Sequence, residues 1–291
     1  MIFMLHKTKV LFLALFSIAF SYKARGQSKL AAKFDTEKMQ FIGTKHQQAT
    51  YLLRYVQKYA HLGDTLKTLP PFLDSILNGE IKLARKKALK KYLSTANITD
   101  EEIGGSLDSG ICSVDGIKAS YFVIHDTSNF LTDSTSFPTN IDSVSWSGNR
   151  LDNKRTFKLT HIFINRLGAS ITSNNLSRQI HATKFESPTK NPLLNKSVVG
   201  SFIHIEVIQP RIADPGKKND AIAIIPGFTD LQYKRLALIY IIASFRKGEW
   251  LIPTFHAVLD DGIPDGHDDP QNFELEKFDQ AINEIYRSLT R

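Results

Sequence analysis

The sequence predicts an α/β protein, in which a central mixed β-sheet is flanked by helices and preceded by a small all-helical region. Strand-like segments mixed with helical segments after residue 108 indicate the sheet. Helical periodicity alone fills most of the preceding eighty residues. A polar, glycine-containing stretch separates the two. We therefore expect a signal peptide at 1–26, a helical N-terminal region of unknown role at 27–108, and an α/β domain at 109–291.

The first 26 residues have the three parts of a secretory signal peptide. A short basic segment, Met1–Lys9, precedes an apolar run of eleven residues, Val10–Phe20, and small residues then mark a cleavage site near Ala24–Gly26. The alternative is a membrane anchor, but the run is well short of the roughly 20 residues that a span needs. We expect an exported protein, periplasmic or secreted, whose mature chain has no transmembrane span.

The N-terminal region shows two helical patterns separated by Pro70–Pro71. Apolar residues recur at helical spacing over 51–59 and again over 81–93. The second pattern includes Lys82–Lys91, which carries six positive charges. These charges indicate a solvated helix face or contact with an anionic envelope surface.

The expected α/β domain contains three clear strands and two helices. The strands are Ala119–His125, Phe157–Asn165 and Ser201–Ile208, and a short fourth strand is expected at Trp250–Ile252. The first helix is expected to begin at a capping box, Thr229–Gln232, and to end at Gly248. An amphipathic pattern over 275–289 predicts the second helix.

Composition excludes several classes of protein. The 291-residue chain is 42% hydrophobic, enough for a substantial core, and its single cysteine, Cys112, excludes a disulfide framework and a thiolate-rich metal site. The net charge of +8 comes from the first 109 residues, because acidic and basic residues balance in 110–291. A basic working face is therefore absent from the domain, and we expect no nucleic acid as partner.

Candidate chemistry gathers at the ends of strands. His125 ends one strand, and His256 follows another and precedes an acidic loop, Asp260–Pro270. Two imidazoles and a carboxylate form a common ligand set for catalytic zinc, although buried structural histidines are the alternative. Glu206 lies within an apolar strand, which indicates a general base with a raised pKa or an ion pair with Arg211.

Four segments in order, VIHDTS, THIFINRLG, FIHIEV and a histidine followed by DP-x-x-F, resemble a known family. They are similar to the zinc-dependent N-acetylmuramoyl-L-alanine amidases of type 2, which are related to the peptidoglycan recognition proteins. The resemblance covers roughly residues 115–290 and has no counterpart for the helical N-terminal region.

The resemblance implies that His125, His256 and Asp269 bind one Zn²⁺ and that Glu206 is catalytic. His267 stands where the family usually has lysine, so it would stabilise the oxyanion, with activity falling as the imidazole loses its charge above neutral pH. The loop before Asp269 is longer than in compact members. Asp268 and His267 therefore remain alternatives for the third ligand.

The reaction implied is hydrolysis of the amide between N-acetylmuramic acid and the L-alanine of the stem peptide, by zinc-activated water with Glu206 as general base. Thr160 and His161 would line the substrate cleft, and Arg178 and Lys184 would bind peptide carboxylates. The partner is thus peptidoglycan or its muropeptides. Two alternatives stay open: a non-catalytic wall-binding module on the same fold, or a zinc hydrolase of another envelope amide. The oligomeric state is not predicted.

Overall fold

A computed structural model describes residues 33–131, 136–216 and 221–290. The predicted signal peptide lies outside the described residues. Within the described ranges, no helix has both the length and the apolar character that crossing a bilayer requires.

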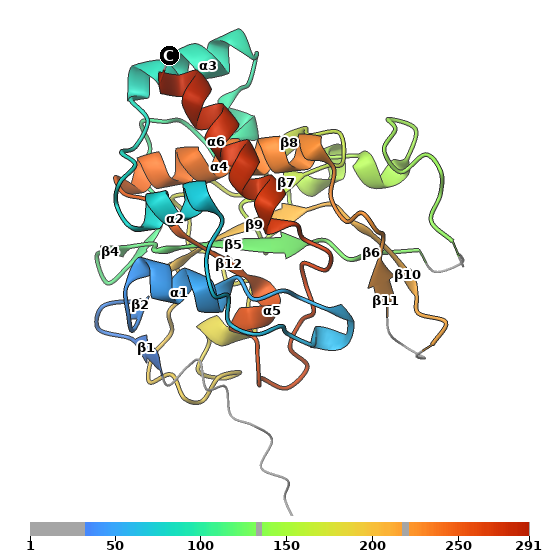
Figure 1. Ribbon diagram of the computed structural model, residues 1–291, viewed down its shortest axis with the longest axis horizontal. Helices are drawn as coiled ribbons and strands as arrows, with labels where there is room; N and C mark the ends of the chain where they lie inside the picture. Colours follow the sequence, from blue (N-terminus) through green and yellow to red (C-terminus); the bar gives the residue numbers. More distant parts are fainter. Residues whose placement is uncertain (1–32, 132–135, 217–220, 291) are drawn as a thin grey trace, which may run out of the picture.

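A five-stranded mixed sheet forms the centre of the molecule (Figure 1), as the sequence predicts. The first four strands are parallel, and the last runs antiparallel to its neighbour. In spatial order the strands are β12 (Ile252–Phe255), β5 (Tyr121–Asp126), β9 (Phe202–Val207), β7 (Ile162–Ile164) and β8 (Ser170–Thr172). Because parallel strands end at one edge, the residues that end or follow these four strands gather there.

Two long helices cover one face of the sheet (Figure 1). Helix α4 (Asp230–Lys247) begins with the predicted capping box of Thr229 and ends at Gly248, which adopts a left-handed conformation. Helix α6 (Leu275–Thr290) packs beside it. Tyr240 of α4 joins the layers, since its ring lies 5.3 Å from Phe122 of β5 and 5.7 Å from Phe278 of α6.

The opposite face carries α5 (His256–Leu259) and only the first part of the N-terminal region, up to residue 52 (Figure 1). Strands β1 (Phe34–Asp35) and β2 (Gln40–Phe41) form a hairpin, followed by α1 (Lys45–Leu52). The rings of Phe34 and Phe41 lie 6.4 and 5.2 Å from that of Tyr121, on the face that also bears His125. The N-terminal residues thus share one hydrophobic core with the sheet.

The N-terminal region is less helical than the sequence predicts. Its helices are α1, α2 (Pro71–Leu77) and α3 (Lys86–Thr95). Helix α1 overlaps the first predicted pattern only at residues 51–52, and α3 begins five residues after the start of the second pattern. The β1–β2 hairpin contradicts the prediction of an all-helical region. The sequence did not reveal it, because strands of two residues are too short to produce an alternating pattern. The polar stretch 97–110 buries Ile103 and Leu107 rather than lying free of the core.

The remaining elements are short. A second sheet contains β6 (Asn129–Phe130), β10 (Pro210–Ala213) and β11 (Ala221–Ala223), and β3 (Ser113–Val114) pairs with β4 (Ile117–Lys118). Single 3-10 turns occur at Lys58–Ala60, Asp100–Glu102, Ser147–Asn149, Asp152–Lys154 and Lys184–Glu186. Strand β7 is shorter than the predicted strand Phe157–Asn165, and Thr160 and His161 lie before its first residue.

Candidate metal centre

Three predicted ligands converge at the carboxyl edge of the sheet. His125 lies near the end of β5, His256 is the first residue after β12, and Asp269 comes from the loop between α5 and α6. One ligand atom of each lies within 4.8 Å of the others, and all three residues are buried. These residues could hold a metal ion.

The distances in this cluster fit a small tetrahedral cation. The two Nδ1 atoms of His125 and His256 are 2.9 Å apart, and the Asp269 carboxylate lies 3.0 Å from the second and 3.6 Å from the first. Ligands about 2.0–2.1 Å from a tetrahedral zinc ion lie roughly 3.3 Å from one another. The observed separations bracket that value, so only small side-chain movements are needed.

Backbone contacts hold Asp269 in place. The N–H of Asp126 donates to its carboxylate at 3.2 Å, and the N–H of Ala257 donates to its carbonyl at 2.9 Å. The loop is therefore tied both to the end of β5 and to the start of α5. Asp268 points elsewhere, because its carboxylate accepts from Arg211 at 2.6 Å. Among the three candidates for the third ligand, Asp269 is the one placed with both histidines.

The charges of the cluster are strongly coupled. Burial, together with the neighbouring His256, lowers the pKa of His125 well below its usual value, so His125 is neutral. Burial would also lower the pKa of His256, but the carboxylates of Asp269 and Asp260 raise it well above its usual value. A metal ion would have to displace a proton from His256, which makes binding weaker in acid.

Glu206 lies beside the cluster without a hydrogen-bond partner for one oxygen. It pairs in register with His125 on the neighbouring strand, and its Oε1 is 4.0 Å from His125 Nδ1. Its Oε2 is buried and accepts no hydrogen bond within the described structure. Burial and the Asp269 carboxylate raise the pKa of Glu206 well above its usual value. The ion pair with Arg211 does not form, since that guanidinium binds Asp126 and Asp268.

His267 stacks on His256 at the solvent side of the cluster. The two ring centroids are 4.3 Å apart, and the His267 side chain is 52% exposed. Its Nδ1 lies 3.3 Å from the buried carboxylate of Asp260, which also contacts His256. His256, Asp260 and His267 form a second group with metal-binding spacing. This group shares His256 with the first.

The residues predicted to bind substrate are not gathered in one place. Thr160 and His161 are fully buried, and their polar atoms are hydrogen-bonded to His204 and Arg178. Arg178 is exposed and donates to Asn174, while Lys184 donates to the backbone of Asp265. The structure brings none of these four side chains into the metal cluster.

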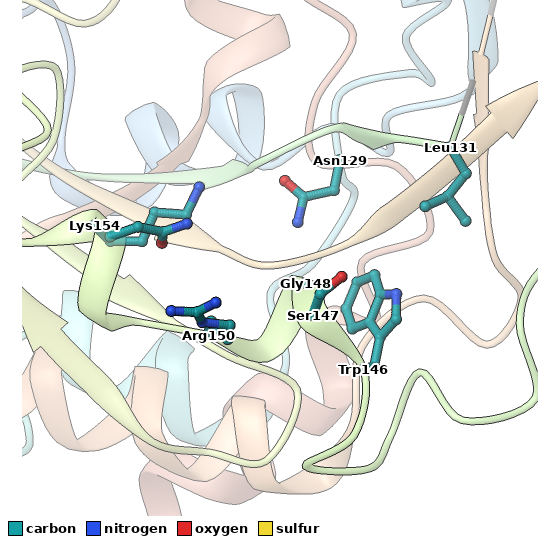
Figure 2. A pocket seen from close by; sticks show the side chains of 8 residues that line it. Asn129, Leu131, Trp146, Ser147, Gly148, Arg150 and Lys154 are labelled. Atoms are coloured by element: carbon teal, nitrogen blue, oxygen red, sulfur yellow. The ribbon is translucent and has the colours of Figure 1, made fainter. Parts of the chain in front are cut away.

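A cavity of about 350 Å³ lies near the same edge of the sheet. Figure 2 shows Asn129, Arg150 and Lys154 at one end of it and Trp146 and Leu131 at the other. The lining residues are Asn129, Leu131, Trp146, Ser147, Gly148, Arg150, Asn153 and Lys154. They come from β6 and from the loop before β7, and sequence reasoning did not single them out.

Lys154 connects this cavity to the cluster. Its Nζ lies 5.2 Å from the ring centroid of Phe163, and Phe163 pairs in register with Glu206. The Lys154 charge also acts to lower the pKa of Glu206, against the larger effect of burial. Lys154 therefore contributes a positive charge on the Glu206 side of the cavity, whereas Arg150 is paired with Asp152 at 2.5 Å.

Comparisons with known proteins identify no relative: no family model, no curated protein and no solved structure matches the chain.

Proposed function

We propose that this protein is an exported, zinc-dependent amidase that cleaves the bond between N-acetylmuramic acid and the L-alanine of the peptidoglycan stem peptide. The observation that carries the proposal is one constellation. The ligand atoms of His125, His256 and Asp269 converge, and beside them stands Glu206, a half-buried carboxylate whose buried Oε2 accepts no hydrogen bond within the described structure. The reaction class follows from that chemistry, and the substrate from the motif resemblance.

His125, His256 and Asp269 would hold the metal, and two nitrogens with one carboxylate oxygen suit zinc. When bound, zinc supplies an activated water and polarises a carbonyl. The raised pKa of Glu206 suits it to take a proton from the attacking water and return it to the leaving amine of L-alanine. His267 stands at the exposed side of the cluster, where a protonated ring would stabilise the developing oxyanion.

The cavity lined by Lys154 is the candidate substrate-binding surface of the proposed enzyme. Stem peptides carry carboxylates, and Lys154 lines the cavity with a positive charge, beside Arg150, which is paired with Asp152 at 2.5 Å. Trp146 and Leu131 offer apolar surface at its other end. In the proposed enzyme these residues, rather than Arg178 and Lys184, receive the peptide.

The test is digestion of purified peptidoglycan, with and without a strong chelator, read by mass spectrometry. The expected products are free stem peptides that begin with L-alanine, released only when zinc is present. Zinc is then compared with Mn²⁺ and Mg²⁺ on chelator-treated protein, and Glu206→Gln serves as the inactive control.

Two results would replace the proposal. Intact muropeptides with the protein retained on the wall would indicate a wall-binding module. Metal-dependent release of fragments cut at another amide would keep the hydrolase and change its substrate.

A further inference from the structure

Behind the metal cluster runs a chain of three buried side chains. His125 Nε2 lies 3.0 Å from His204 Nδ1, and His204 Nε2 lies 3.3 Å from the carboxylate of Glu186. Exposed fractions are 2% for His125 and zero for the other two. A glutamate with no access to water is costly unless its oxygens are well bonded, so this chain needs a physical explanation.

Protons in the chain can be assigned from the Glu186 end. Its Oε2 accepts from the N–H groups of Ala182 and Thr183, at 3.1 and 2.8 Å, and from the Thr183 hydroxyl at 2.9 Å. Three donors to one oxygen favour an ionised carboxylate. An ionised carboxylate only accepts hydrogen bonds, so His204 must donate from Nε2.

The assignment passes through His204 to the metal ligand. A neutral imidazole that carries its proton on Nε2 has an accepting Nδ1. If that Nδ1 accepts, His125 donates to it from Nε2 at 3.0 Å and keeps a lone pair on its own Nδ1. That Nδ1 is the atom that faces His256 and Asp269.

Neighbouring residues hold the His204 ring. His161 accepts from the His204 backbone N–H at 3.0 Å, and its ring lies parallel to that of His204, with 5.9 Å between centroids and 12° between planes. The Thr160 hydroxyl donates to the His204 carbonyl at 2.8 Å. Thr160 and His161 therefore fix His204 and do not face a cleft.

The other ligand histidine shows the same arrangement in a shorter form. His256 Nε2 lies 3.1 Å from Asp260 Oδ2, while Asp260 Oδ1 accepts from the N–H of Phe185 at 3.0 Å. Both ligand histidines thus turn Nδ1 toward the cluster and Nε2 toward a buried carboxylate. One contact is direct, and the other passes through His204.

We propose that Glu186 and His204 are positioning residues, which hold His125 in the tautomer protonated on Nε2 and so keep the Nδ1 lone pair available to a metal ion. The inference rests on the metal-binding part of the proposed function and not on its substrate. Residues that orient metal-binding histidines typically contribute about 10–100-fold in metal affinity.

Glu186→Gln tests this with little change in shape. The three donors at Oε2 require an oxygen there, so the glutamine NH₂ group must face His204 Nε2. His204 then carries its proton on Nδ1 and donates to His125 Nε2, which moves the His125 proton to Nδ1. We expect zinc affinity, measured by competition with a chromophoric chelator, to fall about 10–100-fold.

Asp279→Asn is the matched control. Asp279 is also a buried carboxylate, and it accepts from the Leu73 N–H at 2.6 Å, but it lies on α6. It should leave zinc affinity unchanged. Unchanged affinity in Glu186→Gln would overturn the proposal.

Nitrogen NMR of the histidine rings in metal-free wild-type protein needs no variant and decides the matter if Glu186→Gln does not fold. The proposal requires the Nε2–H tautomer of His125 and of His204, and the Nδ1–H tautomer of either would overturn it. Zinc binding that depends on Glu186, without cleavage of peptidoglycan, would refute the proposed substrate alone. Cleavage with no dependence of zinc affinity on Glu186 would refute this inference alone.

Discussion

Replacing Glu206 with glutamine should change activity and stability in opposite directions. The carboxylate stands at a half-buried strand position, with one oxygen 4.0 Å from His125 Nδ1 and the other buried without a hydrogen bond. Glutamine keeps the shape and removes the charge. If Glu206 is a general base, the variant loses about 10²–10⁴-fold in kcat. Zinc affinity should stay unchanged, since Glu206 is not a predicted ligand.

Stability should rise, because an unsatisfied buried acceptor costs about 1–3 kcal/mol and more when charged. Relieving part of that cost would add on the order of 1 kcal/mol to the free energy of unfolding. For a chain of this size that corresponds to about 2–4 °C in Tm. A residue kept for structure alone would show the reverse, with the substitution lowering stability.

The pH dependence gives a further check, with its sign set by linkage. The pKa of Glu206 is raised above 4.5 in the folded protein by burial and by Asp269, so the folded state holds this proton more tightly than the unfolded state. The contribution of Glu206 to stability therefore falls as pH rises from 4.5 toward the raised folded pKa. The advantage of Glu206→Gln should be absent below pH 4.5 and grow above it.

The assay is thermal and urea unfolding of metal-free protein between acidic and neutral pH, beside turnover of peptidoglycan by the zinc-loaded enzyme. Glu276→Gln, an exposed position on α6, is the control and should change neither. A variant that is destabilised at neutral pH, or that retains wild-type kcat, would refute the role given to Glu206.

Three further predictions concern the surroundings of Glu206. Asp269→Asn should lose bound zinc, measured as metal per chain after dialysis, whereas Asp268→Asn should retain it, and the opposite result would move the third ligand to Asp268. His267→Ala should lower kcat about 10²–10³-fold, because it removes the proposed oxyanion donor; an unchanged kcat would remove His267 from oxyanion stabilisation. Lys154→Ala should raise KM for muropeptides several-fold with little change in kcat, and an equal KM would exclude the cavity as the peptide site.

The sequence predicted the carboxyl edge of the sheet well, because the same apolar runs mark both the strands and the candidate metal ligands at their ends. Apolar runs ending in His125 or followed by His256 predict both the strand and the place of the side chain. Parallel pairing then brings the two ends together without further information. Asp269 follows the same logic less directly, because its loop has no period and its position depends on backbone contacts with Asp126 and Ala257.

Residues that act through tertiary contacts left no such signal. Glu186 closes a short 3-10 turn with a Thr183–Glu186 capping box, but a capping box does not tell whether its carboxylate is buried or exposed. His161 is next to a strand and has the composition of a cleft residue, yet both its ring nitrogens are hydrogen-bonded in the core. The direction of a side chain near a strand end depends on which segments pack over it. The alternating pattern of the strand carries no information about those segments.

A last prediction asks whether the N-terminal region is a separable domain. Its side chains pack into the same hydrophobic core as the central sheet. Tyr121 on β5 accepts from the Phe41 N–H at 2.6 Å and donates to Gln48 at 2.7 Å, and it packs against Phe34 and Phe41.

Each fully buried apolar side chain of this kind contributes about 1.5–3 kcal/mol, against a total stability of about 5–15 kcal/mol for a domain. Deleting residues 28–108 should therefore give an insoluble or unfolded chain, whereas a separable regulatory domain would leave soluble protein with intact zinc affinity. Phe41→Ala is the milder probe and should cost about 3–5 kcal/mol in urea unfolding. If the deletion variant folds and binds zinc, residues 28–108 cover the sheet without stabilising it. Their contacts with Tyr121 would then contribute nothing to the stability of residues 109–291.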